Sequence, residues 1–197
     1  MAGVCGRYAS SRSPDDLTEY FEVEQVATGE RVLSPDYNVA PTKDVYAVLT
    51  RAPSGEDTAR RSLRIVRWGL VPSWAKDPAI GNRMINARLE TAAEKPAYRR
   101  AFARRRCLVP ADGYYEWYTP QGDEQGGQRG GRRPRKQPFY IRRPDGDPLA
   151  LAGLYEFWRP PDSDPADPNA WVTSMTLLTT SAPDDTGRIH DRAPLMI

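Results

Sequence analysis

The stretch LALAGLYEFW at residues 149–158 decides the fold class. Large apolar and aromatic side chains fill it, and a segment rich in Pro and Asp follows at residues 159–169, which is typical of a strand that ends in a loop. Strand-like composition returns in WVTSMTLLTT at residues 171–180. These segments predict two long strands of one sheet, with a Pro- and Asp-rich loop between them.

Shorter strand candidates lie elsewhere along the chain. They combine β-branched or aromatic residues with flanking turn residues, and they lie at residues 45–50, 63–68, 107–109, 114–118 and 139–142. Helical signals are fewer. Ser13 is a candidate N-cap before Pro14, and residues 87–94 and 98–106 have helical propensity. We expect a single α+β domain over residues 1–197, with a mixed or antiparallel β-rich core and few short helices.

The composition is that of a folded domain with little net charge. The 197 residues include 28 Lys and Arg against 26 Asp and Glu, and five Trp and ten Tyr supply apolar bulk. The segment at residues 121–137 is rich in Gly and Arg, so we expect a mobile basic insertion loop there. No apolar run is long enough to span a bilayer or act as a signal sequence. We therefore expect a cytoplasmic, monomeric protein with no membrane partner.

Several enzyme classes lack their motifs in this sequence. HExxH, a phosphate loop ending in Gly-Lys-Ser/Thr, GxGxxG after a strand and GxSxG are all absent. One His and two widely separated Cys cannot form a four-ligand structural zinc site. We expect no bound metal and no cofactor. Metalloproteases, P-loop nucleotide hydrolases, Rossmann enzymes and α/β-hydrolases are therefore disfavoured.

The basic residues are almost all arginine, 24 against four lysines. For composition alone, a GC-rich genome that replaces Lys by Arg is the better explanation, so the positions of the residues must decide. Aromatic, Pro and amide residues gather in segments at residues 37–41, 68–74, 86–91 and 109–117. Such segments suit proteins that stack unpaired bases while Arg contacts phosphates. Burial in the core is the competing explanation for each Trp.

The two cysteines have different surroundings. Cys107 lies in the apolar segment at residues 107–109, and a small buried side chain in a strand is its expected role. Cys5 precedes Gly6 and Arg7 near the start of the chain, where core packing gives little reason for a cysteine. Because a neighbouring Arg favours the thiolate, we expect Cys5 to be the reactive thiol.

Three further residues are candidates for catalysis. Glu116 lies among Tyr and Trp, where burial raises the pKa of a carboxyl towards values that suit proton transfer. His190 is the one histidine, so any mechanism that needs an imidazole must use it, although a lone His is more often structural. Taken alone, Asn86 is best explained as the cap of a helix from residue 87.

Six segments together resemble the SOS response-associated peptidase (SRAP) family, the abasic-site processing proteins. They occur in order over nearly the whole chain, at residues 5–8 (CGRY), 37–42 (YNVAPT), 68–74 (WGLVPSW), 86–91 (NARLET), 107–117 (CLVPADGYYEW) and 189–192 (IHDR). The resemblance implies an α+β domain that binds single-stranded DNA and senses abasic sites in the DNA damage response. It also implies a covalent protein–DNA crosslink, and association with the nucleoid when bound.

The resemblance assigns roles to individual positions. Cys5 matches the family's nucleophile, which acts as the N-terminal residue, and Asn86, Glu116 and His190 match its other active-site residues. Arg88 and Arg192 match residues that hold phosphates beside the lesion. The full set of expected DNA-binding residues is Arg7, Asn38, Pro41, Trp68, Trp74, Arg88, Trp117 and Arg192.

The expected chemistry depends on a free amine and a thiol on one residue. The α-amine of an N-terminal Cys can condense with the aldehyde of an opened abasic sugar, and the thiol then closes a thiazolidine ring. Here, however, Met1 to Val4 precede Cys5. Either Val4 is encoded by a GTG start codon, which is the favoured hypothesis, or the chain cleaves itself before Cys5.

Two further departures from the family concern the end of the chain. Ala193 stands where family members usually have Met after the His-Asp-Arg segment. The chain also ends at Ile197, where members usually continue, so either a short gene or a trimmed chain omits a closing element.

Two other functions remain open on the sequence. A cysteine-dependent peptidase or amidohydrolase would use Cys5 as nucleophile and His190 as base, and would form no lasting bond to DNA. A non-catalytic module for single-stranded nucleic acid would use the same Arg and aromatic residues and would keep its function in Cys5→Ala. The crosslinking function predicts lyase-type chemistry, with self-cleavage as an additional peptidase activity.

Overall fold

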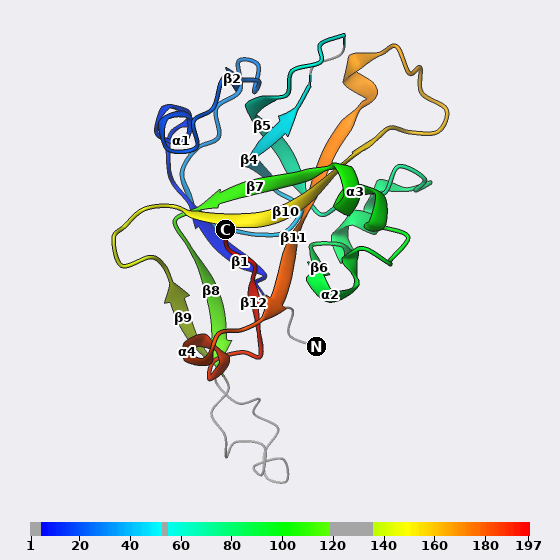
Figure 1. The fold of residues 1–197 in the computed structure, drawn as a ribbon. Coiled ribbons are helices and arrows are strands. Elements are labelled where there is room, and N and C mark those ends of the chain that lie inside the picture. The colour runs from blue at the N-terminus through cyan, green and yellow to red at the C-terminus, as the bar shows by residue number, and fades with distance from the viewer. Residues whose placement is uncertain (1–4, 53–54, 119–135) are drawn as a thin grey trace.

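A computed structural model describes residues 5–52, 55–118 and 136–197 (Figure 1). Most of the basic segment predicted at residues 121–137 therefore lies outside the described residues. Its last residue, Gln137, is described and already opens a strand. The order of elements confirms the α+β class, with a β-rich core and few short helices.

The larger sheet is built on the two long strands predicted from the sequence. β10 (Leu149–Trp158) pairs antiparallel with β11 (Val172–Ser181). The Pro- and Asp-rich segment at residues 159–169 connects them, as predicted, and ends in a short 3-10 helix, η3 (Pro168–Ala170). The remaining strands of this sheet are β2 (Gln25–Val26), β4 (Asp44–Arg51), β5 (Arg60–Trp68), β6 (Asn86–Arg88), β7 (Arg106–Ala111) and β12 (Arg192–Pro194).

The strand order closes most of this sheet on itself. Neighbours follow the order β12-β11-β10-β7-β4-β5-β2, and β11 also pairs in parallel with β5 through Ser174↔Arg67 and Met175↔Trp68. The strands from β11 to β5 therefore form a closed ring, in which each inward-facing side chain meets side chains from several strands. β6 adds a short parallel strand to β11.

A second sheet of four antiparallel strands packs against this ring. Its order is β3 (Asp36–Val39), β1 (Arg7–Ser10), β8 (Gly113–Tyr118) and β9 (Gln137–Ile141). The register pairs Arg7 with Tyr115 and Tyr8 with Tyr114. β7 and β8 follow one another directly in the chain, so one segment contributes to both sheets (Figure 1).

The helices are short. They are α1 (Pro14–Tyr20), η1 (Pro78–Arg83), α2 (Leu89–Ala92), α3 (Arg99–Arg104) and α4 (Asp184–Gly187). Helices pack against strands of the larger sheet, α1 against β5, α2 against β11 and α3 against β7 and β10. The predicted cap at Ser13 is confirmed. Its side-chain oxygen accepts from the Asp16 N–H, and the Asp16 carboxylate accepts from the Ser13 N–H. In the part of the chain that is described, no helix is long and apolar enough to cross a membrane.

Asn86 does not cap a helix. It begins β6, and α2 starts only after Arg88, which makes no side-chain cap. Pairing with β11 through Asn86↔Leu177 holds residues 86–88 extended, so a tertiary contact outweighs the local helical propensity.

The two sheets share one core, and Trp68 connects them. Its side chain is fully buried, its ring centroid lies 5.1 Å from that of Tyr8 in β1, and its indole N–H donates to the Ile85 carbonyl at 2.9 Å. A residue of the ring thus touches the second sheet and the segment that leads into β6. This contact fixes the relative position of β1 and β6.

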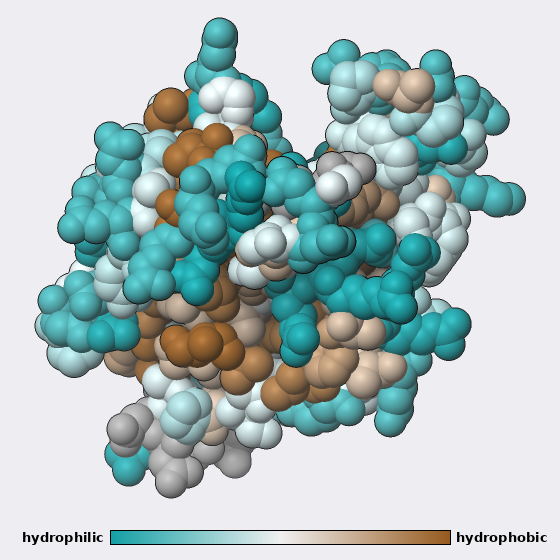
Figure 2. All heavy atoms as spheres, turned by 45° about the horizontal axis from the view of Figure 1, so that its top comes forward, coloured by the Kyte–Doolittle hydropathy of each residue, from teal (hydrophilic) through white to brown (hydrophobic). Residues whose placement is uncertain are grey.

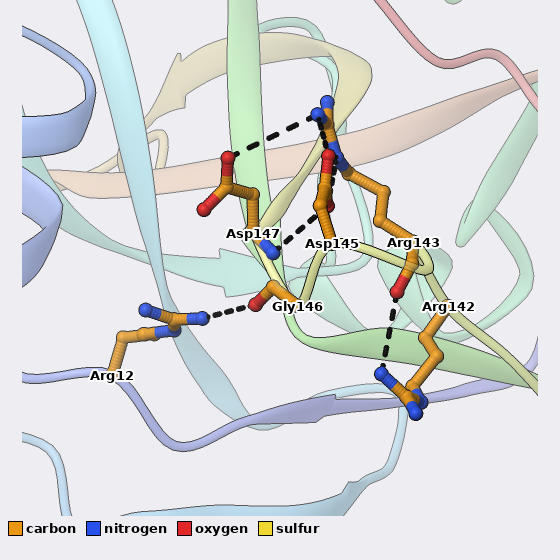
Figure 3. Close-up of polar contacts among 6 residues, drawn as sticks. All are labelled: Arg12, Arg142, Arg143, Asp145, Gly146 and Asp147. Carbon is orange, nitrogen blue, oxygen red and sulfur yellow. Dashed lines mark hydrogen bonds and ion pairs between the residues drawn. The ribbon is translucent and has the colours of Figure 1, made fainter.

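The connection between β9 and β10 is fixed by arginines (Figure 3). Arg143 binds the carboxylate of Asp145, which also accepts from the Asp147 N–H, and Arg12 donates to the Gly146 carbonyl. Arg12 follows β1 directly. The turn after β9 is therefore anchored to the start of the chain through the second sheet.

Candidate active site

Cys5 and Glu116 meet at the start of the second sheet. Cys5 precedes β1 and Glu116 lies in β8, and the pairing Arg7↔Tyr115 brings the two residues side by side. The Cys5 backbone N–H donates to Glu116 Oε1 at 2.6 Å. Cys5 has φ of 45°, a left-handed conformation that costs energy for a residue with a side chain. The site thus holds the Cys5 nitrogen in a strained position against a carboxyl group.

The environment of Glu116 favours its protonated form. Burial raises the pKa of its carboxyl, as expected from the sequence, while the Cys5 N–H, the charge of His190 and the Trp117 N–H each lower it in part. A carboxyl with a raised pKa is a better proton carrier near neutral pH.

The prediction of a Cys5 thiolate is wrong for the intact chain. Burial raises the pKa of the Cys5 thiol far above its usual range, and the negative charge of Glu116 raises it further. Arg7, which was expected to favour the thiolate, instead donates to Asn38 Oδ1 at 2.9 Å. The thiol of this state is therefore protonated and shielded from solvent.

His190 lies in the loop before β12, with one ring nitrogen held locally. Its Nδ1 accepts from the Arg192 N–H at 3.1 Å and also lies 2.9 Å from Asp191 Oδ1. The first contact requires an Nδ1 without a proton and the second an Nδ1 that carries one, so the two contacts cannot form at the same time. In both states, Nε2 is the nitrogen left for a substrate.

Asn86 reaches this region from the larger sheet. The residue before it, Ile85, receives the indole N–H of Trp68, and Trp68 packs on Tyr8. Burial raises the pKa of the Tyr8 hydroxyl, and the nearby Cys5 raises it further. The structure therefore brings Cys5 and Glu116 into direct contact. Asn86 begins β6 of the larger sheet, and His190 lies in the loop before β12.

The outer face of the second sheet carries several expected DNA-binding residues. Arg7 and Asn38 are joined there by their hydrogen bond, and Trp117 shares the face with Tyr115 at a centroid distance of 6.5 Å. Tyr115 belongs to the aromatic segment at residues 109–117, but neither it nor Tyr140 was among the expected DNA-binding residues. Their rings lie 5.0 Å apart on the paired strands β8 and β9. In β8, Tyr115 and Trp117 alternate with the buried residues Tyr114 and Glu116. This two-residue alternation is the sequence signal that places Tyr115 on the same face as Trp117.

Arg192 and Arg88 lie together but differ in what they bind. The Arg192 guanidinium binds both oxygens of Glu90 and the Thr179 carbonyl, and this bond lowers the pKa of Glu90 to about 2. Arg88 is exposed and pairs along the backbone with Thr179. Arg88 is thus open to a phosphate, whereas Arg192 must first exchange Glu90 for it.

The two expected Trp contacts in the WGLVPSW segment have opposite placements. Trp68 is fully buried, so its assignment to DNA binding is wrong for this structure and its role is packing. Trp74 is 61% exposed. Gly69 (φ 126°) permits the turn between them, because a Cβ there would lie 2.6 Å from the Gly81 carbonyl oxygen. Pro41 is half-buried next to Thr42, whose N–H donates to the Trp68 carbonyl.

No group of three or more His, Cys, Asp or Glu suited to hold a metal ion occurs among the described residues. The site offers a nitrogen, a thiol, a carboxyl and an imidazole. These groups suit proton transfer and covalent capture of a carbonyl.

Comparison with known proteins places this arrangement in a family. The chain is 34% identical over 194 residues to abasic site processing protein YoqW of Bacillus subtilis, covering 98% of this chain and 76% of that protein. It is 28% identical over 227 residues to abasic site processing protein HMCES of Xenopus tropicalis, covering 98% and 63%. A solved protein from Bacteroides thetaiotaomicron shares the fold, with a TM-score of 0.76 at 22% identity over 98% of this chain and 77% of that one. The family model for SOS response associated peptidase (SRAP) matches residues 4–197, and the chain therefore belongs to the SRAP family.

Proposed function

We propose that this protein binds single-stranded DNA in the DNA damage response, senses abasic sites and, once Cys5 is its N-terminal residue, links covalently to them. Relatives across 98% of the chain are abasic site processing proteins. The observation that carries the proposal is the 2.6 Å hydrogen bond between the Cys5 nitrogen and the Glu116 carboxyl. It holds the atom that would become the α-amine beside a proton carrier.

Formation of the thiazolidine needs only the amine and thiol of Cys5, the aldehyde of the sugar and a group that transfers protons. The Cys5 amine, with an ordinary pKa of about 8 and so partly neutral at pH 7, attacks the aldehyde carbon of the opened sugar. Water leaves, and an imine forms. The thiol then adds to the imine carbon, its proton ends on the nitrogen, and a thiazolidine ring closes. Glu116 transfers protons to and from the nitrogen and the departing oxygen.

His190 and Asn86 have supporting roles in this scheme. The His190 Nε2 donates a proton or hydrogen bond to the sugar oxygen, which favours ring opening to the aldehyde. Asn86 orients the sugar from β6. The thiazolidine would shield the lesion from strand cleavage, and the bound protein would be found with the nucleoid.

The test compares chains whose first residue is shown by intact mass to be Cys5. The wild type should form a heat-stable adduct with an abasic oligonucleotide. Cys5→Ser retains the amine but lacks the thiol, so its imine should survive denaturation only after reduction with borohydride. If verified N-terminal Cys5 leaves the abasic oligonucleotide unmodified, crosslinking is excluded.

The same contact supports self-cleavage as a second activity. In the intact chain, the Cys5 nitrogen is the leaving group of the Val4–Cys5 peptide bond, and Glu116 stands 2.6 Å from it. Attack by the thiol on the Val4 carbonyl carbon would form a thioester as the carbon–nitrogen bond breaks, with Glu116 carrying the thiol proton to the nitrogen. Water would then hydrolyse the thioester, which gives a free carboxyl on Val4 and a free amine and thiol on Cys5. The intact chain and its Glu116→Gln variant are incubated, and their masses are measured by mass spectrometry over time. Loss of residues 1–4 should occur only in the wild type. Persistence of these residues in both would leave the GTG start as the source of an N-terminal Cys5.

A further inference from the structure

A second basic site lies at the far end of the long strands. A hollow of about 950 Å³ opens between α3, the end of β10 and the start of β11. The space-filling surface is hollowed beside the lobe at its upper right, where hydrophilic residues border the depression (Figure 2). Its lining combines arginines with aromatic rings, namely Arg51, Arg100, Arg104, Arg105, Tyr155, Phe157 and Trp171, together with Glu156, Ser73 and Pro165.

The charge of this hollow is largely uncompensated. Only Arg105 is paired, through its ion pair with the buried Glu156. Across the described part of the chain, Arg51, Arg100 and Arg104 make no ion pair. By contrast, arginines elsewhere on the surface, such as Arg31 and Arg60, do bind carboxylates. Three clustered cations without a carboxylate partner among the described residues favour an anionic ligand.

The aromatic rings make that ligand more specific. The Arg51 and Arg105 guanidinium groups lie 5.2 and 5.7 Å from the centroid of the Phe157 ring, which fixes both around one aromatic side chain. Trp171 contacts Arg159 in the same way yet remains 43% exposed. Cations beside an exposed aromatic ring suit a phosphate with a base stacked next to it. An acidic peptide would use the cations but not the ring.

This hollow is distant from Cys5. Trp171 stands just before β11, whereas His190 lies beside the other end of that strand, where the Ala182 N–H donates to the Asp191 carbonyl. The ten residues of β11 span up to about 33 Å at about 3.3 Å per residue. One nucleotide cannot fill both places.

We propose that this hollow is a second binding site for single-stranded DNA, taking a phosphate and a stacked base of the strand some nucleotides away from the site at Cys5. The proposal rests on the proposed function for the identity of the strand. It adds a second anchor that needs neither Cys5 nor a lesion.

The test uses undamaged DNA, so it is independent of crosslinking. Arg100→Glu/Arg104→Glu removes two exposed, unpaired cations of the hollow. Arg83→Glu/Arg142→Glu is the matched control, with the same charge change at two exposed arginines outside the hollow that also make no ion pair with a described residue. Binding is measured for an oligonucleotide of about five nucleotides and for one of about 25, because one single-strand site covers about 4–16 nucleotides.

The hollow variant should bind the long oligonucleotide about tenfold or more weakly than the control does. The slope of the logarithm of its binding constant against the logarithm of the salt concentration should be smaller by about 0.7 for each lost phosphate contact. Crosslinking of a short abasic oligonucleotide by the N-terminal Cys5 form should be unchanged. A 5-iodouracil in the long strand should photo-crosslink to Trp171. Equal binding by both variants, or competition by polyglutamate as strong as that by DNA, would overturn the proposal. Failure of Cys5 to crosslink would instead refute the proposed function and leave the undamaged-DNA result standing.

Discussion

Glu116 couples the stability of the fold to pH. Burial raises the pKa of its carboxyl in the folded chain, whereas an unfolded Glu titrates near about 4.3. The folded state therefore holds the proton more tightly. The resulting stability is complete below the unfolded pKa and is lost as pH rises through the folded pKa.

Glu116→Gln should remove this dependence while keeping an acceptor for the Cys5 N–H. Urea unfolding of both proteins from about pH 4 to about pH 8 should show the wild type losing stability relative to the variant as pH rises. Titrations of the other carboxyls cancel in the comparison. A difference that stays constant with pH would show that Glu116 titrates normally.

Both thiols of the intact chain should resist modification. Burial raises the pKa of the Cys5 thiol above its usual range and that of Cys107 to about 12, so little thiolate forms and reagents cannot reach it. Ellman's reagent should react slowly with the folded protein at neutral pH. After denaturation in urea it should react with two equivalents of thiol, the two cysteines of the chain. Rapid reaction of one equivalent in the folded state would restore the thiolate first predicted for Cys5.

The identity of the site residues was easier to predict than their electrostatics. Cys5, Glu116 and His190 are proposed as site residues because their motifs match a family, and the raised pKa of the Glu116 carboxyl was expected from its aromatic neighbours. The state of Cys5 was missed, because the charge next to a thiol depends on strand register. Pairing of β1 with β8 supplies Glu116, while Arg7 turns to Asn38.

At the level of elements, α1 offers a direct test of local sequence signals. Ser13→Ala should lower the free energy of unfolding by about 1 kcal/mol, because it removes the hydroxyl that accepts from the Asp16 N–H and donates to the Asp16 carboxylate. Urea unfolding of this variant and of Ser34→Ala, an exposed serine outside any helix, would measure the effect. A loss no larger than that of the control would mean that packing of Leu17 alone holds the helix.

Local signals succeed where an element completes its own hydrogen bonds. Ser13 and Asp16 are three residues apart, so the cap could be predicted from adjacent residues. Asn86 failed as a cap because its partner strand, β11, lies about 90 residues further along the chain. The pairing of β11 with β5 likewise joins distant segments, and no pattern in the sequence predicts it.

At the scale of the whole molecule, the two sheets depend on one another through Trp68. Its ring lies against Tyr8 of the second sheet, and its N–H holds Ile85 ahead of β6. The candidate catalytic groups come from both sides of this contact, since Glu116 belongs to β8 and Asn86 to β6. The geometry of the site is therefore a property of how the sheets pack.

Trp68 and Trp74 separate packing from DNA contact within one motif. Trp68→Phe replaces the buried indole by a smaller ring and removes its hydrogen bond to the Ile85 carbonyl, so it should destabilise the fold by about 1–3 kcal/mol. At temperatures where it is folded, its affinity for undamaged single-stranded DNA should equal that of the wild type. Trp74→Ala changes an exposed side chain, so stability should stay within about 0.5 kcal/mol.

Trp74→Ala should bind the same DNA more weakly, with a loss of binding free energy of about 1–3 kcal/mol, which is the contribution of one stacked base. Urea unfolding and fluorescence anisotropy on the same preparations would measure both quantities. If Trp68→Phe instead weakened DNA binding without loss of stability, Trp68 would have to leave the core to meet a base. The sheets would then open when DNA binds, because the contact that joins them is the one the base would replace.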